Sequence, residues 1–126
     1  MRIAMLAALG MMSSCAMGDR HDSGEARLAA ELAGRSAGEA RACVNTARRD
    51  GLRVIDERTL LYREGQTLWV NRLPSACPSL HPASTLIVEI RGGRYCNGDL
   101  VRTLEPGSSI PGPACSFGDF VPYTRR

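Results

Sequence analysis

The chain has 126 residues, which is enough for one domain and too few for several. It carries 16 basic and 13 acidic residues, a formal net charge of +3, and every basic residue is an arginine. Nucleic-acid binding needs a concentrated basic footprint, whereas these arginines are scattered, with Arg48-Arg49 and Arg125-Arg126 as the only doublets. The composition therefore argues against a nucleic-acid-binding protein. A GC-rich genome accounts for the choice of arginine, because selection for planar bidentate contacts would predict clustering.

The first fourteen residues are typical of a bacterial export signal. Arg2 supplies a positive charge, residues 3–12 form an apolar run, and Ser13 and Ser14 are small. A bilayer-spanning helix needs roughly 20 apolar residues, so this run is too short to anchor the chain by itself. Residues 1–14 are therefore predicted to be a cleaved signal peptide.

Cys15 directly follows this signal and predicts a lipid anchor. Met12-Ser13-Ser14-Cys15 resembles the lipobox of bacterial lipoproteins, in which leucine is commoner than methionine at the first position. The resemblance implies cleavage before Cys15 and acylation of its sulfur and its new amine, for example with palmitate. Two or more chains give stable anchoring, because each buried methylene contributes about 0.8 kcal/mol. The alternative is an ordinary cleaved signal with an incidental cysteine.

Residues 15–41 are predicted to be a flexible tether between the lipid and the domain. They are small, polar and charged and contain no aromatic residue, so they cannot bury enough apolar surface to offset their ordering entropy. A short helix over residues 25–33 would place Leu28 and Leu32 on one face and end at Gly34. An isolated helix of that length is marginal in water.

Residues 42–126 are expected to form a domain of strands. From Arg53 onwards the apolar residues recur mostly at every second position, which is typical of strands. The runs 59–63 and 67–71 flank a short loop that contains Gly65, and together they predict a β-hairpin.

Residues 85–91 form the strongest predicted strand, and Gly92-Gly93 after them is a hairpin turn signal. Asn97-Gly98 is a second turn signal only four residues later. Two turns so close together cannot both close ordinary hairpins. We therefore interpret Asn97-Gly98 as a β-bulge, with residues 99–104 continuing the strand.

The closing segment, residues 115–123, is expected to pack Phe117, Phe120 and Val121 into the core. Several short strands with turn signals between them predict a mainly β fold, a small antiparallel β-sandwich or barrel tied by disulfides. The strands do not alternate with helices, so an α/β enzyme fold is not expected.

With Cys15 acylated, an even number of cysteines remains: Cys43, Cys77, Cys96 and Cys115. In an oxidising compartment this predicts two disulfides. Four cysteines allow three pairings. We favour Cys77–Cys96 with Cys43–Cys115, because the second bridge would tie the two ends of the domain.

Metal and nucleophile sites are not expected. Zinc sites pair close ligands such as Cys-x-x-Cys, and no two of these four cysteines are closer than 19 positions. His81 lies four residues after Cys77, but an oxidised Cys77 cannot serve as a nucleophile. No metal and no cofactor are therefore predicted.

Other candidates for chemistry are also better explained by structure. Asp56-Glu57 and Asp99 could supply paired carboxylates, but acidic residues at strand ends usually cap turns or face solvent. Tyr62 and Trp69 could form a ligand platform, but on adjacent strands they are more often a cross-strand pair in the core. The protein is therefore not expected to be an enzyme.

Short segments around the cysteines form an ordered pattern: Cys43, Arg53-Val54-Ile55-Asp56, Thr59-Leu60-Leu61, Trp69-x-Asn71-x-Leu73, Cys77-Pro78-x-Leu80, Cys96-x-x-Asp99 and Cys115-x-Phe117-Gly118-x-Phe120-x-Pro122. This pattern spans roughly residues 41–123. It resembles a family of small Gram-negative lipoproteins catalogued as a domain of unknown function, in which leucine is usual in place of Phe117. The resemblance implies an envelope location and a cysteine-tied domain, and it carries over no catalytic residues.

We therefore expect an outer-membrane lipoprotein that faces the periplasm, since lipoprotein sorting rules imply the outer membrane where Ala16, and not aspartate, follows Cys15. Its expected role is binding or structural, with the membrane as one partner through the lipid and an envelope protein or ligand as another. The alternative is a small envelope enzyme or enzyme inhibitor. A cleft with convergent polar groups and perturbed ionisation would favour an enzyme. An exposed apolar patch or an unpaired strand edge would favour a binding module.

Overall fold

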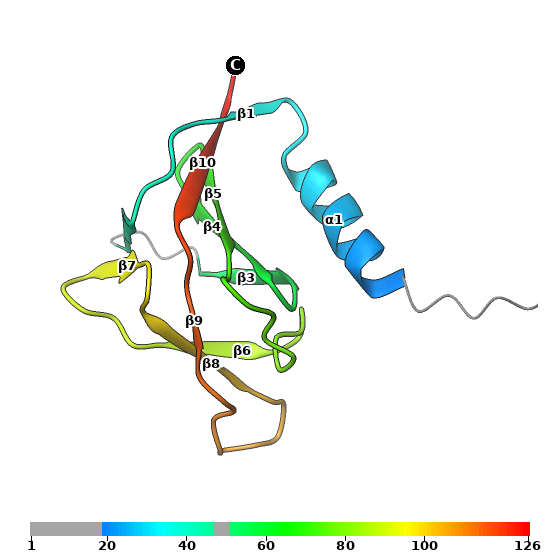
Figure 1. The fold of residues 1–126 in the computed structure, drawn as a ribbon, viewed down its shortest axis with the longest axis vertical. Coiled ribbons are helices and arrows are strands. Elements are labelled where there is room, and N and C mark those ends of the chain that lie inside the picture. Colours follow the sequence, from blue (N-terminus) through cyan, green and yellow to red (C-terminus); the bar gives the residue numbers. More distant parts are fainter. Residues whose placement is uncertain (1–18, 47–50) are drawn as a thin grey trace, which may run out of the picture.

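The computed structural model describes residues 19–46 and 51–126. The predicted signal peptide and the predicted lipidation at Cys15 lie outside the described residues. The described part forms one helix and ten strands (Figure 1): α1 (Asp19–Glu31), β1 (Arg35–Ala37), β2 (Cys43–Asn45), β3 (Arg53–Asp56), β4 (Thr59–Glu64), β5 (Thr67–Arg72), β6 (Thr85–Val88), β7 (Arg94–Cys96), β8 (Leu100–Leu104), β9 (Cys115–Ser116) and β10 (Phe120–Arg125).

The strands form three antiparallel sheets. The largest has five strands in the order β1-β10-β5-β4-β3, and the smaller ones are β2-β7 and β6-β8-β9. The predicted hairpin is confirmed as β4 and β5, which pair from Thr59↔Arg72 to Glu64↔Thr67. The predicted mainly β, sandwich-like fold is therefore confirmed, and the described strands do not close into a barrel.

The five-stranded sheet is covered on both faces. One cluster of buried side chains joins its Leu60 and Tyr62 to Val44 of β2 and Val101 of β8. The other cluster joins Leu61 of the same strand to α1. Because side chains alternate along a strand, β4 supplies apolar residues to both layers, which explains the run of consecutive buried residues at its start.

The prediction of a flexible tether over residues 15–41 is wrong for the described part of that segment. The predicted helix exists and begins earlier, at Asp19, and its Leu28 is only 4% exposed. Leu28 packs with residues of β3, β4 and β5. Most helical stability in proteins comes from such tertiary packing, so a segment too polar to fold alone becomes ordered on the sheet.

The chain after α1 also belongs to the sheet. β1 pairs antiparallel with β10, with Arg35 opposite Arg125 and Ala37 opposite Tyr123. Arg41 then exchanges two backbone hydrogen bonds of 2.8 Å with Phe120. The domain therefore begins before residue 42, and the predicted boundary there is corrected.

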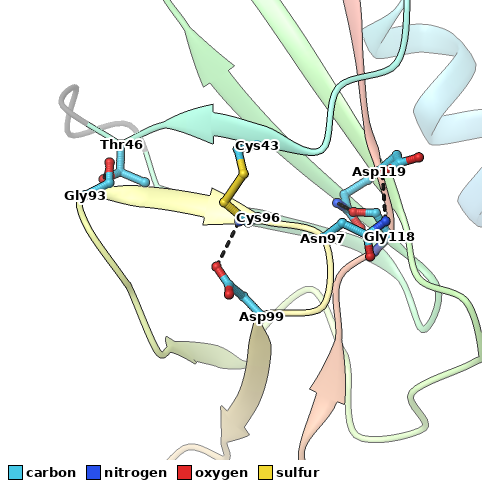
Figure 2. The surroundings of a disulfide bond; sticks show 9 residues. Cys43, Thr46, Gly93, Cys96, Asn97, Asp99, Gly118 and Asp119 are labelled. Atoms are coloured by element: carbon cyan, nitrogen blue, oxygen red, sulfur yellow. Dashed lines mark hydrogen bonds between the residues drawn. A yellow bond between two sulfur atoms is a disulfide. The ribbon is translucent and has the colours of Figure 1, made fainter.

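All four predicted cysteines form disulfides, but the favoured pairing is wrong. The bridges are Cys43–Cys96 and Cys77–Cys115. Cys43 lies directly opposite Cys96 in the β2–β7 pair, as Figure 2 shows.

The pairing differs because Gly92-Gly93 does not join a regular hairpin. It closes only an isolated bridge between Arg91 and Arg94, after which β7 leaves β6 and pairs with β2. β6 pairs instead with β8, from Thr85↔Leu104 to Val88↔Val101. Because β7 pairs with β2 and not with β6, Cys96 lies beside Cys43. No residue pattern near Cys96 in the sequence predicts this pairing.

Asn97-Gly98 is a turn and not a bulge. Gly98 has a φ of +86°, a left-handed conformation that favours glycine. The amide of Asp99 donates to the carbonyl of Cys96 at 3.0 Å, and the Asp99 carboxylate accepts from the amide of Cys96 at 2.8 Å (Figure 2). Turns are therefore present at both Gly92-Gly93 and Asn97-Gly98. They can lie so close together because the three-residue strand between them, β7, belongs to a different sheet from β6 and β8.

The closing segment packs as predicted around Phe117 and Phe120, which are fully buried, while Val121 is only partly buried. The buried side chain of Asn71 fixes Gly118 between them: its amide donates to the Gly118 carbonyl at 2.8 Å and its oxygen accepts from the Gly118 amide at 2.9 Å. A Cβ at position 118 would overlap the carbonyl oxygen of Arg72. The close approach of these two segments therefore requires glycine there.

Candidate functional site

The structure separates the residues considered for chemistry. Cys77 is bonded to Cys115, so it forms no nucleophile with His81. Asp56 and Glu57 line a pocket together with His81, whereas Asp99 lies elsewhere and binds the amide of Cys96. Within residues 19–46 and 51–126, no group of three or more histidine, cysteine, aspartate or glutamate side chains could hold a metal ion.

Tyr62 and Trp69 belong to the core and not to a ligand platform. They lie directly opposite one another on β4 and β5, with exposures of 1% and 6%. The Tyr62 hydroxyl donates to the Asn45 carbonyl at 2.9 Å. Burial of Tyr95 beside Tyr62 raises the pKa of the Tyr95 phenol, which keeps it neutral at physiological pH.

A groove of about 770 Å³ lies between α1 and the five-stranded sheet. Five arginines from five different elements line it: Arg27 of α1, Arg35 of β1, Arg53 of β3, Arg63 of β4 and Arg125 of β10. We call this feature the arginine groove. One carboxylate, Glu31, lies among these groups, so the lining residues carry a net formal charge of +4.

Strand pairing explains why the arginines converge. Arg35 lies directly opposite Arg125 on β1 and β10. Arg63 is two positions after Leu61 on β4, so it points to the same face of the sheet as α1. On the helix, Arg27 and Glu31 are one turn apart and share a face. These residues are distant in the sequence, and only the docking of α1 and β1 brings them together.

Three of the five guanidinium groups are held by the fold. Arg27 donates to the carbonyl of Ile55. Arg35 donates to the carbonyls of Gln66 at 2.6 Å and Tyr123 at 3.3 Å. Arg53 pairs with Glu31 at 2.8 Å.

The ion pair between Glu31 and Arg53 stabilises the charged forms of both groups at the helix side of the groove. Its hydrogen bond is the main reason that the pKa of Glu31 is lowered from 4.5, with Arg63 and Arg35 adding to the effect, and it raises the pKa of Arg53. The C-terminal end of α1 also lies at the groove, through Ala30 and Glu31. The partial negative charge of a helix C-terminus stabilises nearby cations, so this end of α1 helps to hold arginines close together.

The two remaining arginines have no such partner among the described residues. Arg63 and Arg125 form no side-chain hydrogen bond or ion pair with any other residue in the described ranges. A guanidinium group presents a planar set of donors that matches phosphate and carboxylate oxygens. The groove therefore combines three arginines held by the fold with two guanidinium groups whose donors have no partner among the described residues, an arrangement suited to an anion.

A second feature is a set of exposed apolar side chains. Large apolar side chains are exposed at Ile87, Ile90, Leu100 and Ile110. Ile87 lies on β6, which is an edge strand of its sheet. A strand edge is one of the features that were expected of a binding module.

The arginine groove is not visible in the sequence, because its five arginines are scattered along the chain. The all-arginine composition was the available signal. It became informative only once the sheet order placed β1, β10, β4 and β3 around one end of α1.

The fold and the groove define a small, disulfide-tied β domain with a helix on one face and a groove of net positive charge. The chain belongs to a family of unknown function, DUF6491, whose profile matches residues 1–122. The predicted membership of a domain-of-unknown-function family is therefore confirmed. No curated protein and no solved structure matches the chain significantly. In the part of the chain that the structure describes, no helix is both long and apolar enough to cross a membrane.

Proposed function

We propose that this protein is a lipid-anchored binding module of the cell envelope that holds an anionic ligand in the arginine groove. The signal-like residues 1–14 and the lipobox-like Cys15 support the location. The two disulfides support an oxidising compartment, because such bonds persist outside the cytosol. Anchorage of this kind would hold the domain at the periplasmic face of the outer membrane.

The observation that carries the anion-binding role is the pair of free guanidinium groups at Arg63 and Arg125. Like charges held close together repel one another, and the three neighbouring arginines cannot move away because the fold holds them. A bound anion would relieve this repulsion and supply acceptors for the free donors. A groove lined by one sign of charge also concentrates oppositely charged ligands.

Binding is a better account of the groove than catalysis. General acid–base catalysis works best with a group that titrates near the operating pH. The one carboxylate in the groove, Glu31, is paired with Arg53, which lowers its pKa. Glu31 is therefore ionised at neutral pH and serves to position Arg53.

The proposal predicts opposite effects for two charge changes in the groove. In calorimetric titrations with inorganic phosphate, Arg63→Gln should weaken binding by about ten- to a hundredfold, since a hydrogen bond to a charged group contributes about 1.5–3 kcal/mol. Glu31→Gln should strengthen it, because it removes the competing carboxylate and frees Arg53. The affinity should also fall as salt is added.

Arg94→Gln is the matched control, because Arg94 is an exposed arginine on β7 outside the groove. It changes the net charge by the same amount as Arg63→Gln and should leave phosphate binding unchanged. Equal losses for Arg63→Gln and Arg94→Gln would reduce the effect to net charge and reject the groove as the site.

A further inference from the structure

A second pocket, of about 480 Å³, adjoins the arginine groove under the first half of α1. We call it the loop pocket, because five of its lining residues come from the loop between β5 and β6: Ala76, Pro78, Leu80, His81 and Pro82. Arg27 and Pro82 line both the groove and the loop pocket. The two spaces therefore share a wall in the middle of the helix.

The positive and negative charges around the loop pocket cancel, whereas those around the arginine groove leave a net positive charge. Glu25 pairs with Arg72 at 2.7 Å. The guanidinium group of Arg58 donates to the carbonyls of Leu73 at 3.0 Å and Pro74 at 2.9 Å. The Asp56 carboxylate accepts from the Arg58 amide at 2.9 Å.

Four further polar residues line the loop pocket: Ser23, Glu57, Thr59 and His81. The side chains of Glu57 and His81 are exposed to solvent, whereas Thr59 is buried. With His81 neutral, the formal charge of the lining residues is zero. Of the apolar loop residues that line the pocket, Ala76, Pro78 and Pro82 are exposed, so they offer a ligand an uncharged apolar surface.

The loop that forms the pocket is held in place from several sides. Cys77 is bonded to Cys115, and its amide donates to the carbonyl of Glu57 at 2.7 Å. The amide of Leu80 donates to the carbonyl of Cys77 at 2.9 Å, which closes a turn. A pocket already formed in the free protein avoids much of the entropy cost of ordering a loop on binding.

We infer that the ligand is an amphipathic phosphate ester, with its phosphate in the arginine groove and a short apolar body in the loop pocket. This inference rests on the proposed function. A phosphate monoester carries between one and two negative charges at neutral pH, which suits a groove of net charge +4 better than a single carboxylate does. Arg27 lies where the head and the body of such a ligand would join.

The test uses the full mature chain with Cys15→Ser, exported so that the disulfides form and studied without detergent. The probes are inorganic phosphate, octyl phosphate below its micelle concentration, and octanol. Each methylene that leaves water contributes roughly a factor of four in affinity. Octyl phosphate should therefore bind at least about tenfold more tightly than inorganic phosphate, and octanol should bind more weakly than octyl phosphate.

Two variants separate the pocket from the groove. Ala76→Trp fills the loop pocket and should remove the advantage of octyl phosphate while leaving phosphate binding unchanged. Ala83→Trp is the matched control, because Ala83 is exposed in the same loop and lines neither space. Arg63→Gln should weaken the binding of both phosphates.

The outcomes distinguish the two proposals. If inorganic phosphate does not bind, the proposed function fails. If inorganic phosphate binds and octyl phosphate gains nothing, or if Ala76→Trp and Ala83→Trp behave alike, the inference alone is overturned.

A further arm identifies the source of the phosphate ester. Vesicles of phosphatidylcholine with phosphatidic acid should co-sediment with the protein if the ligand is a membrane lipid, and Ala76→Trp should abolish this. Binding of octyl phosphate without vesicle binding would show that the ligand is a soluble amphiphile. Either result supports the inference, and the absence of both overturns it.

Discussion

Leu28→Ala is the sharpest test of whether α1 belongs to the domain. The Leu28 side chain is 4% exposed and packs with Ile55, Leu61, Leu68 and Val70. Truncating a buried leucine to alanine costs about 2–5 kcal/mol. We expect a value near the lower end, about 2–3 kcal/mol, because a helix at the edge of the core can shift to fill part of the cavity.

The measurement is the free energy of unfolding from urea denaturation of the oxidised protein. Leu100→Ala is the matched control, because Leu100 is 37% exposed, and it should cost less than about 1 kcal/mol. A helix that was only a tether would give no cost for Leu28→Ala. Equal values for the two variants would therefore refute the packing of α1 on the sheet.

Three further predictions concern other parts of the chain. Gly118→Ala should cost more than about 2 kcal/mol of stability, because its Cβ would overlap the Arg72 backbone, and Gly51→Ala, which meets nothing within 4 Å, should cost little in the same denaturation assay. Glu31→Gln should lower stability at neutral pH by less than about 1 kcal/mol. Pairing lowers the pKa of Glu31 below 4.5, so its contribution is present above that pH and is lost as the pH falls through the lowered pKa. The difference between Glu31→Gln and wild type should therefore vanish in acid, and a constant difference across pH would contradict this. Metabolic labelling with a palmitate analogue should tag the protein, Cys15→Ala should abolish the tag, and an unlabelled wild type would disprove the lipid anchor.

The features predicted correctly from the sequence are those set by neighbouring residues. The β4–β5 hairpin depends on two β-rich runs and a short loop with Gly65, all within fourteen positions. The buried phenylalanines of the closing segment follow from their size and apolar character alone. Two disulfides followed from the even number of cysteines.

The features predicted wrongly depend on contacts between distant segments. The cysteine pairing depends on β7 leaving β6 for β2, and no residue near Cys96 signals that exchange. The flexible tether was predicted from the composition of residues 15–41 alone. The described part of this segment is ordered because β3, β4 and β5 present an apolar face to Leu28. A continuous run of apolar residues at the start of β4 was a usable signal, because a strand buried on both faces needs a second covering layer.

The arginine groove depends on one feature that is visible in the sequence and on one that only the fold determines. The absence of lysine is visible in the sequence, but the spatial convergence of the arginines depends on the order of strands in the five-stranded sheet. The β1–β10 pairing, which places Arg35 opposite Arg125, joins residues 90 positions apart. Scattering along the chain therefore does not argue against clustering in the fold.

The most direct test of the central claim is an NMR titration that follows the arginine Nε–H resonances as inorganic phosphate is added. We expect the largest shifts from the free guanidinium groups of Arg63 and Arg125, and smaller shifts from Arg27, Arg35 and Arg53. Arg94, which lies outside the groove, should not move. Uniform shifts of all the arginines, or none at all, would contradict an anion site in the groove.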